Sequence, residues 1–185
     1  MNEHVCPVWV GYFLLGPVRK FFTNPDRILK KYVRPGMSVL EPGPAMGFFS
    51  LPLARLVGES GRVVSVDLQE EMIARLKRRA ARAGLAGRMD FRVCREDSLG
   101  VDDLAGTIDF ALAMYVVHEV PDSRRFFLEI FQSLKKGGTF LVAEPVGHVT
   151  KEEFAGTISL ARAVGFELRE TPEIRRTYSA YFARP

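Results

Sequence analysis

The stretch "VLEPGPAMGFFS", residues 39–50, decides the fold of this chain. An apolar run ends at an acid, Glu41, and two prolines and two glycines then interrupt it. The apolar pattern restarts at Phe48. This order predicts a short buried strand over residues 37–41, a glycine-containing loop and a helix over residues 48–58.

The rest of the chain repeats the alternation of short β-rich runs with helical ones. Further strands are predicted at residues 61–67, 89–96, 108–117 and 139–145, further helices at 69–84, 122–138 and 150–165, and two closing β runs at 166–174 and 177–184. Such alternation is typical of a parallel sheet covered by helices. We therefore expect an α/β, doubly wound, mostly parallel seven-stranded sheet with helices on both faces and an antiparallel C-terminal hairpin.

Length and composition indicate one domain, residues 1–185, with enough apolar residues (47%) for a substantial core. Two cysteines, Cys6 and Cys94, are too few for a disulfide framework, and their spacing predicts no metal site. A reduced, cytoplasmic setting is expected. The densest basic run, residues 75–84, has helical spacing and indicates a solvated helix face, so we expect no nucleic-acid partner.

Residues 1–30 are expected to form an N-terminal lid or cap. The segment is rich in apolar and aromatic residues, but Pro7, Gly11 and Gly16 interrupt it before a membrane-spanning length. It carries no basic leader, so no signal peptide and no stable membrane insertion are predicted. Three roles stay open for it: closing over a site, packing on the sheet, or forming a homodimer contact.

The glycine loop lies where open α/β sheets bind ligands, between the first strand and its helix. Gly43 and Gly47 permit unusual dihedral angles, and the helix start behind them offers free N–H groups. A dinucleotide loop would have glycine at the positions of Ala45 and Phe48, so that fingerprint fails. The pattern is acid-x-Gly-x-Ala-x-Gly instead.

With this pattern the chain resembles the class I S-adenosylmethionine-dependent methyltransferases, whose first motif is acid-x-Gly-x-Gly-x-Gly. Glu41, Gly43 and Gly47 match the motif, and Ala45 replaces the middle glycine. The resemblance implies a Rossmann-like methyltransferase fold and S-adenosyl-L-methionine as cofactor, with S-adenosyl-L-homocysteine as product. It also implies that Glu41 and the loop, Ala45 included, lie near the amino-acid end of the cofactor.

The resemblance extends to the ends of the second and third strands. Asp67 matches the acid that binds the ribose hydroxyls, and Leu68 and Met72 would flank the adenine. Asp97 matches the acid that bonds the adenine amino group, with Ser98 beside it. Plain structural roles remain open: the two glycines as turn residues, and Asp67 and Asp97 as caps.

The reacting methyl group is expected to point toward the end of the fourth strand, near Met114, Tyr115 and His118, with Met114 as a further cofactor-binding residue. The imidazole of His118 titrates near neutrality, which makes it the candidate general base or substrate contact, with Tyr115 as the second catalytic candidate. A purely structural hydrogen bond for His118 stays open.

The segments "HEVPD" (118–122) and "LKKGG" (134–138) resemble the small-molecule, quinone-methyltransferase-like branch of the family. The expected function is methyl transfer to a small-molecule acceptor by in-line displacement. Two alternatives stay open, an RNA methyltransferase and a non-catalytic module that binds S-adenosylmethionine. We also expect Ala45 to adopt a negative φ, since L-residues avoid positive values.

Overall fold

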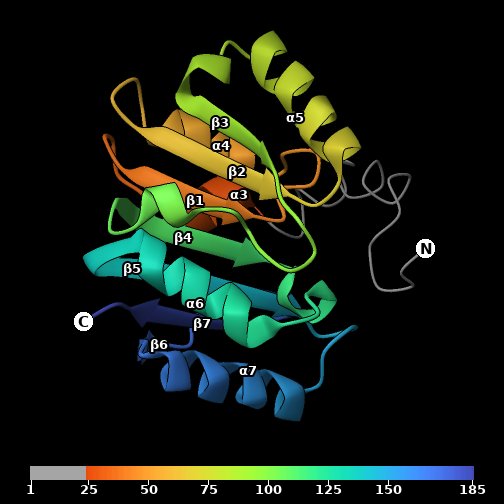
Figure 1. The fold of residues 1–185 in the computed structure, drawn as a ribbon, viewed down its shortest axis with the longest axis vertical. Coiled ribbons are helices and arrows are strands. Elements are labelled where there is room, and N and C mark those ends of the chain that lie inside the picture. Colours follow the sequence, from red (N-terminus) through yellow and green to blue (C-terminus); the bar gives the residue numbers. More distant parts are fainter. Residues whose placement is uncertain (1–23) are drawn as a thin grey trace.

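The structure is a computed structural model that describes residues 24–185 (Figure 1). Its elements are α3 (Pro25–Leu29), β1 (Ser38–Pro42), α4 (Ser50–Leu56), β2 (Arg62–Asp67), α5 (Glu70–Arg82), η1 (Ala86–Arg88), β3 (Met89–Val93), η2 (Asp102–Leu104), β4 (Ile108–Met114), η3 (Val117–Glu119), α6 (Ser123–Ser133), β5 (Leu134–Pro145), α7 (Lys151–Val164), β6 (Glu167–Glu170) and β7 (Thr177–Ala183).

The described strands form one seven-stranded sheet in the order β3-β2-β1-β4-β5-β7-β6. Strands β1 to β5 pair in parallel, whereas β7 runs antiparallel to both β5 and β6. The strand order reverses between β1 and β4, which makes their carboxyl ends the switch point where ligands bind in open α/β sheets. The predicted fold class is confirmed.

Successive side chains along the strands point to opposite faces of the sheet and pack into two hydrophobic cores, one on each face. Val39 joins the cluster that contains residues of α3, α4 and α5, and its neighbour Leu40 joins the cluster that contains residues of α6 and α7. Figure 1 shows α6 across one face of the sheet and α3 and α4 behind the other. Because every central strand is covered on both sides, its apolar run is nearly continuous.

The prediction was wrong about the segment "LKKGG", residues 134–138. We expected it to close a helix, but α6 ends at Ser133 and the segment begins β5. Leu134 is fully buried and pairs with Ile108 of β4. Backbone hydrogen bonds also join Gly137 and Gly138 to Arg184 after β7. These partners are far away in the sequence, so local helix signals could not reveal them.

The predicted start of α7 is confirmed. Thr150 caps the helix through its side chain, which accepts from the Glu153 N–H at 3.2 Å, and the Glu153 carboxylate accepts from the Thr150 N–H at 2.7 Å. Two of the backbone donors at the helix start are thereby satisfied.

The N-terminal part of the described chain packs into the body of the protein. In α3, Leu29 is fully buried in the cluster shared with α4 and α5. The lid prediction for residues 1–30 otherwise falls on residues 1–23, which lie outside the described residues.

Candidate active site

A cavity of about 950 Å³ opens at the carboxyl edge of the sheet. Loops after β1, β2, β3, β4 and β5 line it, together with the turn between β6 and β7. The predicted site residues that line it are Gly43, Ala45, Asp67, Leu68, Met72, Asp97, Ser98, Met114, Tyr115 and His118. The fold thus brings together residues spread over most of the sequence. Glu41 and Gly47 are not among its lining residues.

The glycine loop packs tightly against two neighbours. Gly43 has φ +68°, and a Cβ there would come within 2.6 Å of Val116 Cγ2 in the loop after β4. Gly47 has φ +87°, and a Cβ there would come within 2.4 Å of Leu76 Cδ1 of α5. Gly47 packs against α5 and is not among the residues that line the cavity, so its predicted place at the cofactor stays a prediction.

Ala45 differs from the prediction, because its φ is +48°. The conformation lets its N–H donate to Asp67 Oδ2 at 3.2 Å. The turn therefore holds an alanine in the left-handed region, where L-residues cost about 1–2 kcal/mol. The backbone requirement of this turn, rather than the preference of alanine, sets the dihedral angle.

Asp67 ends β2 and points its carboxylate at the glycine loop. Its second oxygen, Oδ1, accepts from the Gln69 N–H at 2.9 Å, and only 9% of the residue is exposed. Burial raises the pKa of Asp67, against the lowering effect of the backbone N–H donors. A carboxylate offers about four lone-pair sites. The carboxylate also lines the cavity, where it can accept further hydrogen bonds, for example from a diol.

Glu41 is not among the residues that line the cavity, and its predicted contact with a cofactor stays a prediction. It is 3% exposed, and Ser65 Oγ donates to its Oε2 at 3.0 Å. Burial raises the pKa of Glu41 to about 7. The hydroxyls of Ser50 and Ser65 act in the opposite direction, although Ser50 does not meet the geometry of a hydrogen bond. The side chain points into the fold because its strand is covered on both faces.

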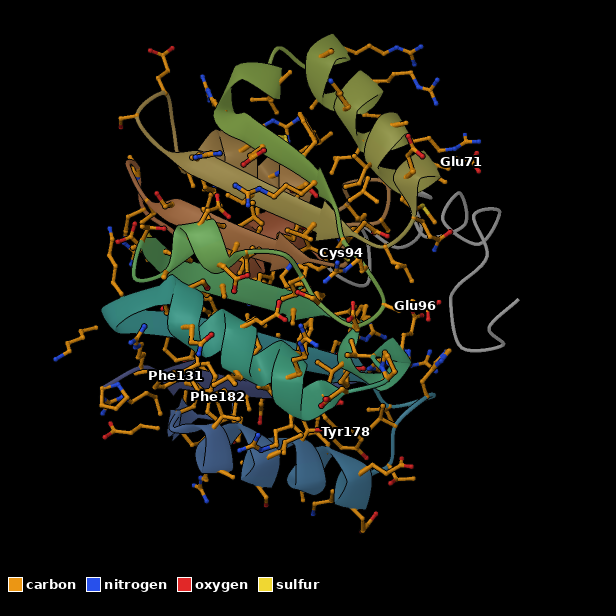
Figure 2. All side chains as sticks on the ribbon, viewed as in Figure 1. Glu71, Cys94, Glu96, Phe131, Tyr178 and Phe182 are labelled. Carbon is orange, nitrogen blue, oxygen red and sulfur yellow. The ribbon has the colours of Figure 1, made fainter. Side chains whose placement is uncertain are left out.

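The loop after β3 supplies the polar groups on the far side of the cavity. Figure 2 shows Cys94 and Glu96 on this loop, where β3 ends. Asp97 is exposed, and its carboxylate lies 3.2 Å from Arg95 Nε and 3.8 Å from an Arg125 nitrogen. Ser98 Oγ accepts from the Gly100 N–H at 3.1 Å and keeps its own proton to donate.

The end of β4 holds its residues in an unusual backbone conformation. Tyr115 has φ +65°, and its N–H donates to the Ala143 carbonyl at 2.8 Å. The Tyr115 hydroxyl lies 2.9 Å from Thr177 Oγ1 of β7. A positive φ at a bulky residue is strained and persists only where surrounding contacts enforce it.

The sequence interpretation missed Glu144, which lies next to the last residue of β5 and is only 1% exposed. Its Oε1 accepts from the N–H groups of Val116 and Val117 at 3.2 and 2.8 Å, and its Oε2 bonds His118 Nδ1. That hydrogen bond raises the pKa of His118, and partial burial opposes the rise. The signal was present in the sequence, because Glu144 follows an apolar run just as Glu41 does.

A second histidine, His148, lies beside the first. The two ring centroids are 5.4 Å apart, and both rings line the cavity. His148 had no predicted role. The turn that carries it follows β5 directly, so only the sheet order places it next to the loop after β4.

The profile of a family described as "Methyltransferase domain" matches residues 34–174, about three quarters of the chain. The chain belongs to this methyltransferase family. The family predicted from the glycine loop is thereby confirmed. Within it, the chain is 30% identical over 112 residues to the ubiquinone/menaquinone biosynthesis C-methyltransferase UbiE of Hydrogenovibrio crunogenus. The match covers 60% of this chain and 43% of that protein, so the chain spans less than half of the relative's length.

Solved structures show the same fold. A SAM-dependent methyltransferase from Aquifex aeolicus has a TM-score of 0.87 at 22% identity, over 98% of this chain and all of that one. The [4+2]-cyclase SpnF has a TM-score of 0.69 at 22% identity, over 82% of this chain and 61% of that one. Proteins with this fold therefore catalyse more than one kind of reaction, so function has to be inferred from the residues of the site.

The described part of the chain contains no helix with the length and apolar composition needed to span a membrane.

Proposed function

We propose that this chain transfers a methyl group from S-adenosyl-L-methionine to a small-molecule acceptor by in-line displacement. The observation that carries the proposal is Asp67, held at the wall of a cavity of about 950 Å³ by the backbone of the glycine loop. Family membership supports it, and so does the name of the relatives, which are C-methyltransferases of quinone biosynthesis.

The cofactor fits the half of the cavity formed by the loops after β1, β2 and β3. The Asp67 carboxylate at the cavity wall suits the ribose diol, and the backbone from Gly43 to Ala45 would lie along the amino-acid end. Leu68 and Met72 offer apolar contact to the adenine. Asp97 and Ser98 offer an acceptor and a donor to its edge. When bound, the cofactor supplies an electrophilic methyl group on a sulfonium.

The acceptor takes the other half, between the loops after β4 and β5. Met114, Tyr115, His118 and His148 line this part. Small-molecule sites have volumes of about 300–1,000 Å³, and this cavity is at the upper end of that range. It has room for a cofactor together with a compact acceptor. Holding the two in line supplies much of the reduction in the barrier.

The proposal includes a cytoplasmic setting. The free thiol of Cys94 is consistent with the reducing conditions there. Burial raises the pKa of this thiol to about 11, so it stays protonated at neutral pH. The proposed partner is the small-molecule acceptor alone, without nucleic acid.

Calorimetry with S-adenosylmethionine and S-adenosylhomocysteine tests the proposal. We expect wild type to bind both, and Asp67→Ala to bind about 10- to 100-fold more weakly, because a hydrogen bond to a charged group contributes about 1.5–3 kcal/mol. Asp103→Ala is the matched control, since Asp103 is an exposed carboxylate paired with Arg92 outside the cavity. It should bind as wild type does. Binding of NADH with no binding of either methyl-cofactor form would refute the proposal.

A further inference from the structure

Glu144 is a buried carboxylate, 1% exposed, that takes part in three hydrogen bonds. It lies next to the last residue of β5 among buried residues, and three donors converge on it: two backbone N–H groups on Oε1 and the His118 ring on Oε2. The two backbone donors fix the carboxylate in place, so the direction of its second oxygen is fixed as well. A group held in this way can orient a partner ring without reorganising.

The ring of His118 is therefore held in one tautomer. A carboxylate only accepts hydrogen bonds, so the nitrogen that faces it, Nδ1, carries the proton. The neutral ring then has its lone pair on Nε2. His118 lines the cavity next to Tyr115, with 21% of its side chain exposed. Nε2 is the nitrogen available to accept a proton there.

Two other titratable groups face this ring. The Glu119 carboxylate of η3 lies 3.9 Å from Nε2, and the His148 ring after β5 lies 5.4 Å away between centroids. With Glu144 on β5, carboxylates lie on both sides of the imidazole. Negative charge on both sides favours an imidazolium that forms during a reaction.

We propose that Glu144 is a positioning residue, and that through it His118 Nε2 accepts a proton from a protic acceptor such as a phenol or hydroquinone hydroxyl. The inference rests on the proposed function and deepens it, because it names the class of acceptor. A neutral amine attacks through a lone pair it already has, whereas a hydroxyl becomes a good nucleophile only as it loses its proton.

The acceptor O–H bond breaks and its proton passes to His118 Nε2, which gives an imidazolium paired with Glu144. The electron pair left on oxygen, or delocalised onto an ortho ring carbon, forms the bond to the methyl carbon. The sulfur–methyl bond breaks with its electrons remaining on sulfur. On a ring carbon, loss of the ring proton to solvent restores the aromatic system.

Nitrogen-15 NMR of the imidazoles tests the positioning without any substrate. We expect wild-type His118 to carry its proton on Nδ1. In Glu144→Gln the side-chain carbonyl stays on the two backbone donors, so its NH₂ faces Nδ1 and forces the Nε2–H tautomer. Glu129→Gln is the matched control, since Glu129 is another buried carboxylate that accepts a loop N–H, that of Leu99 at 2.7 Å. It should leave the His118 tautomer unchanged. An Nε2–H tautomer in wild type overturns the proposal, even if the Gln variant fails to fold.

Turnover with defined probes tests the acceptor class. We expect methylation of 1,4-naphthohydroquinone or catechol in preference to benzylamine. In Glu144→Gln, kcat should fall about 100-fold or more, with affinity for S-adenosylhomocysteine within about threefold of wild type. If kcat of Glu144→Gln fell by less than about threefold, or if benzylamine were the only probe methylated, the inference would be overturned and the proposed function would stand. Failure of wild type to bind the cofactor in calorimetry refutes the proposed function, and the tautomer measurement still decides the role of Glu144.

Discussion

At the scale of single residues, Ala45 departs from the acid-x-Gly-x-Gly-x-Gly motif. It occupies the middle glycine position of the loop and takes the dihedral angle that glycine would take, with φ +48°. The loop keeps this angle because the Ala45 N–H binds Asp67 Oδ2. A contact that orients a candidate binding residue is thus maintained at the cost of local backbone strain.

Replacing Ala45 by glycine should therefore stabilise the protein. Relief of the left-handed strain is worth about 1–2 kcal/mol, and the added freedom of glycine in the unfolded chain cancels about half of it. We expect a net gain of roughly 0.5–1 kcal/mol in urea unfolding, with cofactor affinity equal to or above that of wild type.

Ala113→Gly provides the comparison for this measurement. Ala113 is a fully buried residue of β4 that has no positive φ, so glycine there should lower stability. If Ala45→Gly lost as much stability as Ala113→Gly, strain at Ala45 would be ruled out.

At the scale of elements, α5 determines the shape of the glycine loop. Leu76 of α5 packs against Gly47, and Arg79 donates to the Met46 carbonyl from the same helix. Burial lowers the pKa of Arg79, whose guanidinium lies partly beneath the loop. The helix that follows β2 thus holds the loop that follows β1, while Asp67 between them bonds the same loop.

Gly47→Ala tests this packing, with Gly84→Ala as the matched control. Both glycines have positive φ, +87° and +70°, so both variants carry the same kind of backbone penalty. A Cβ at Gly84 meets nothing within 4 Å, whereas one at Gly47 meets Leu76 Cδ1 at 2.4 Å.

The loss of stability in Gly47→Ala should exceed that in Gly84→Ala by about 1–3 kcal/mol, the usual cost of overpacking. Cofactor affinity should fall in Gly47→Ala alone, because the displaced loop no longer holds Asp67. If Gly47→Ala and Gly84→Ala lost the same stability in urea unfolding, the contact with Leu76 would contribute nothing to the cost of the substitution.

At the scale of the whole molecule, two buried carboxylates, those of Glu41 and Asp67, make stability depend on pH. The pKa of Glu41 rises from its ordinary 4.5 to about 7 on burial, and the pKa of Asp67 is raised for the same reason. A raised pKa means that the folded state keeps its proton where the unfolded chain has lost it. Between pH 4.5 and 7 the folded state then binds more protons, so stability falls as pH rises.

Glu41→Gln should remove most of this fall. A shift from 4.5 to about 7 corresponds to roughly 3 kcal/mol, fully felt above pH 7. We expect wild type and the variant to differ little near pH 4.5 and by about 2–3 kcal/mol in favour of the variant at pH 8, measured by urea unfolding across this range.

Glu59→Gln is the control for this series, because the Glu59 side chain is 94% exposed. Its curve should run parallel to that of wild type. The raised pKa of His118 acts in the same direction at higher pH, since stability present below 6.5 is lost as the pH rises through the raised value. That effect is common to all three proteins and cancels in the comparison. If the stability of Glu41→Gln changed with pH in parallel with that of wild type, the raised pKa of Glu41 would be contradicted.

The sequence by itself determined the alternation of strands and helices, the loop at the first switch point and the family to which the chain belongs. These follow from local periodicity and from residues close together in the chain, such as Glu41, Gly43 and Gly47. The tertiary structure alone decided that residues 134–138 extend a strand, that Glu41 is buried, that Gly47 packs against α5, and that Ala45 has a positive φ. It alone joined Glu144 to His118, 26 residues apart. Each of these depends on which strand lies beside which and on which face is covered, and such long-range pairing leaves no periodic trace in the sequence.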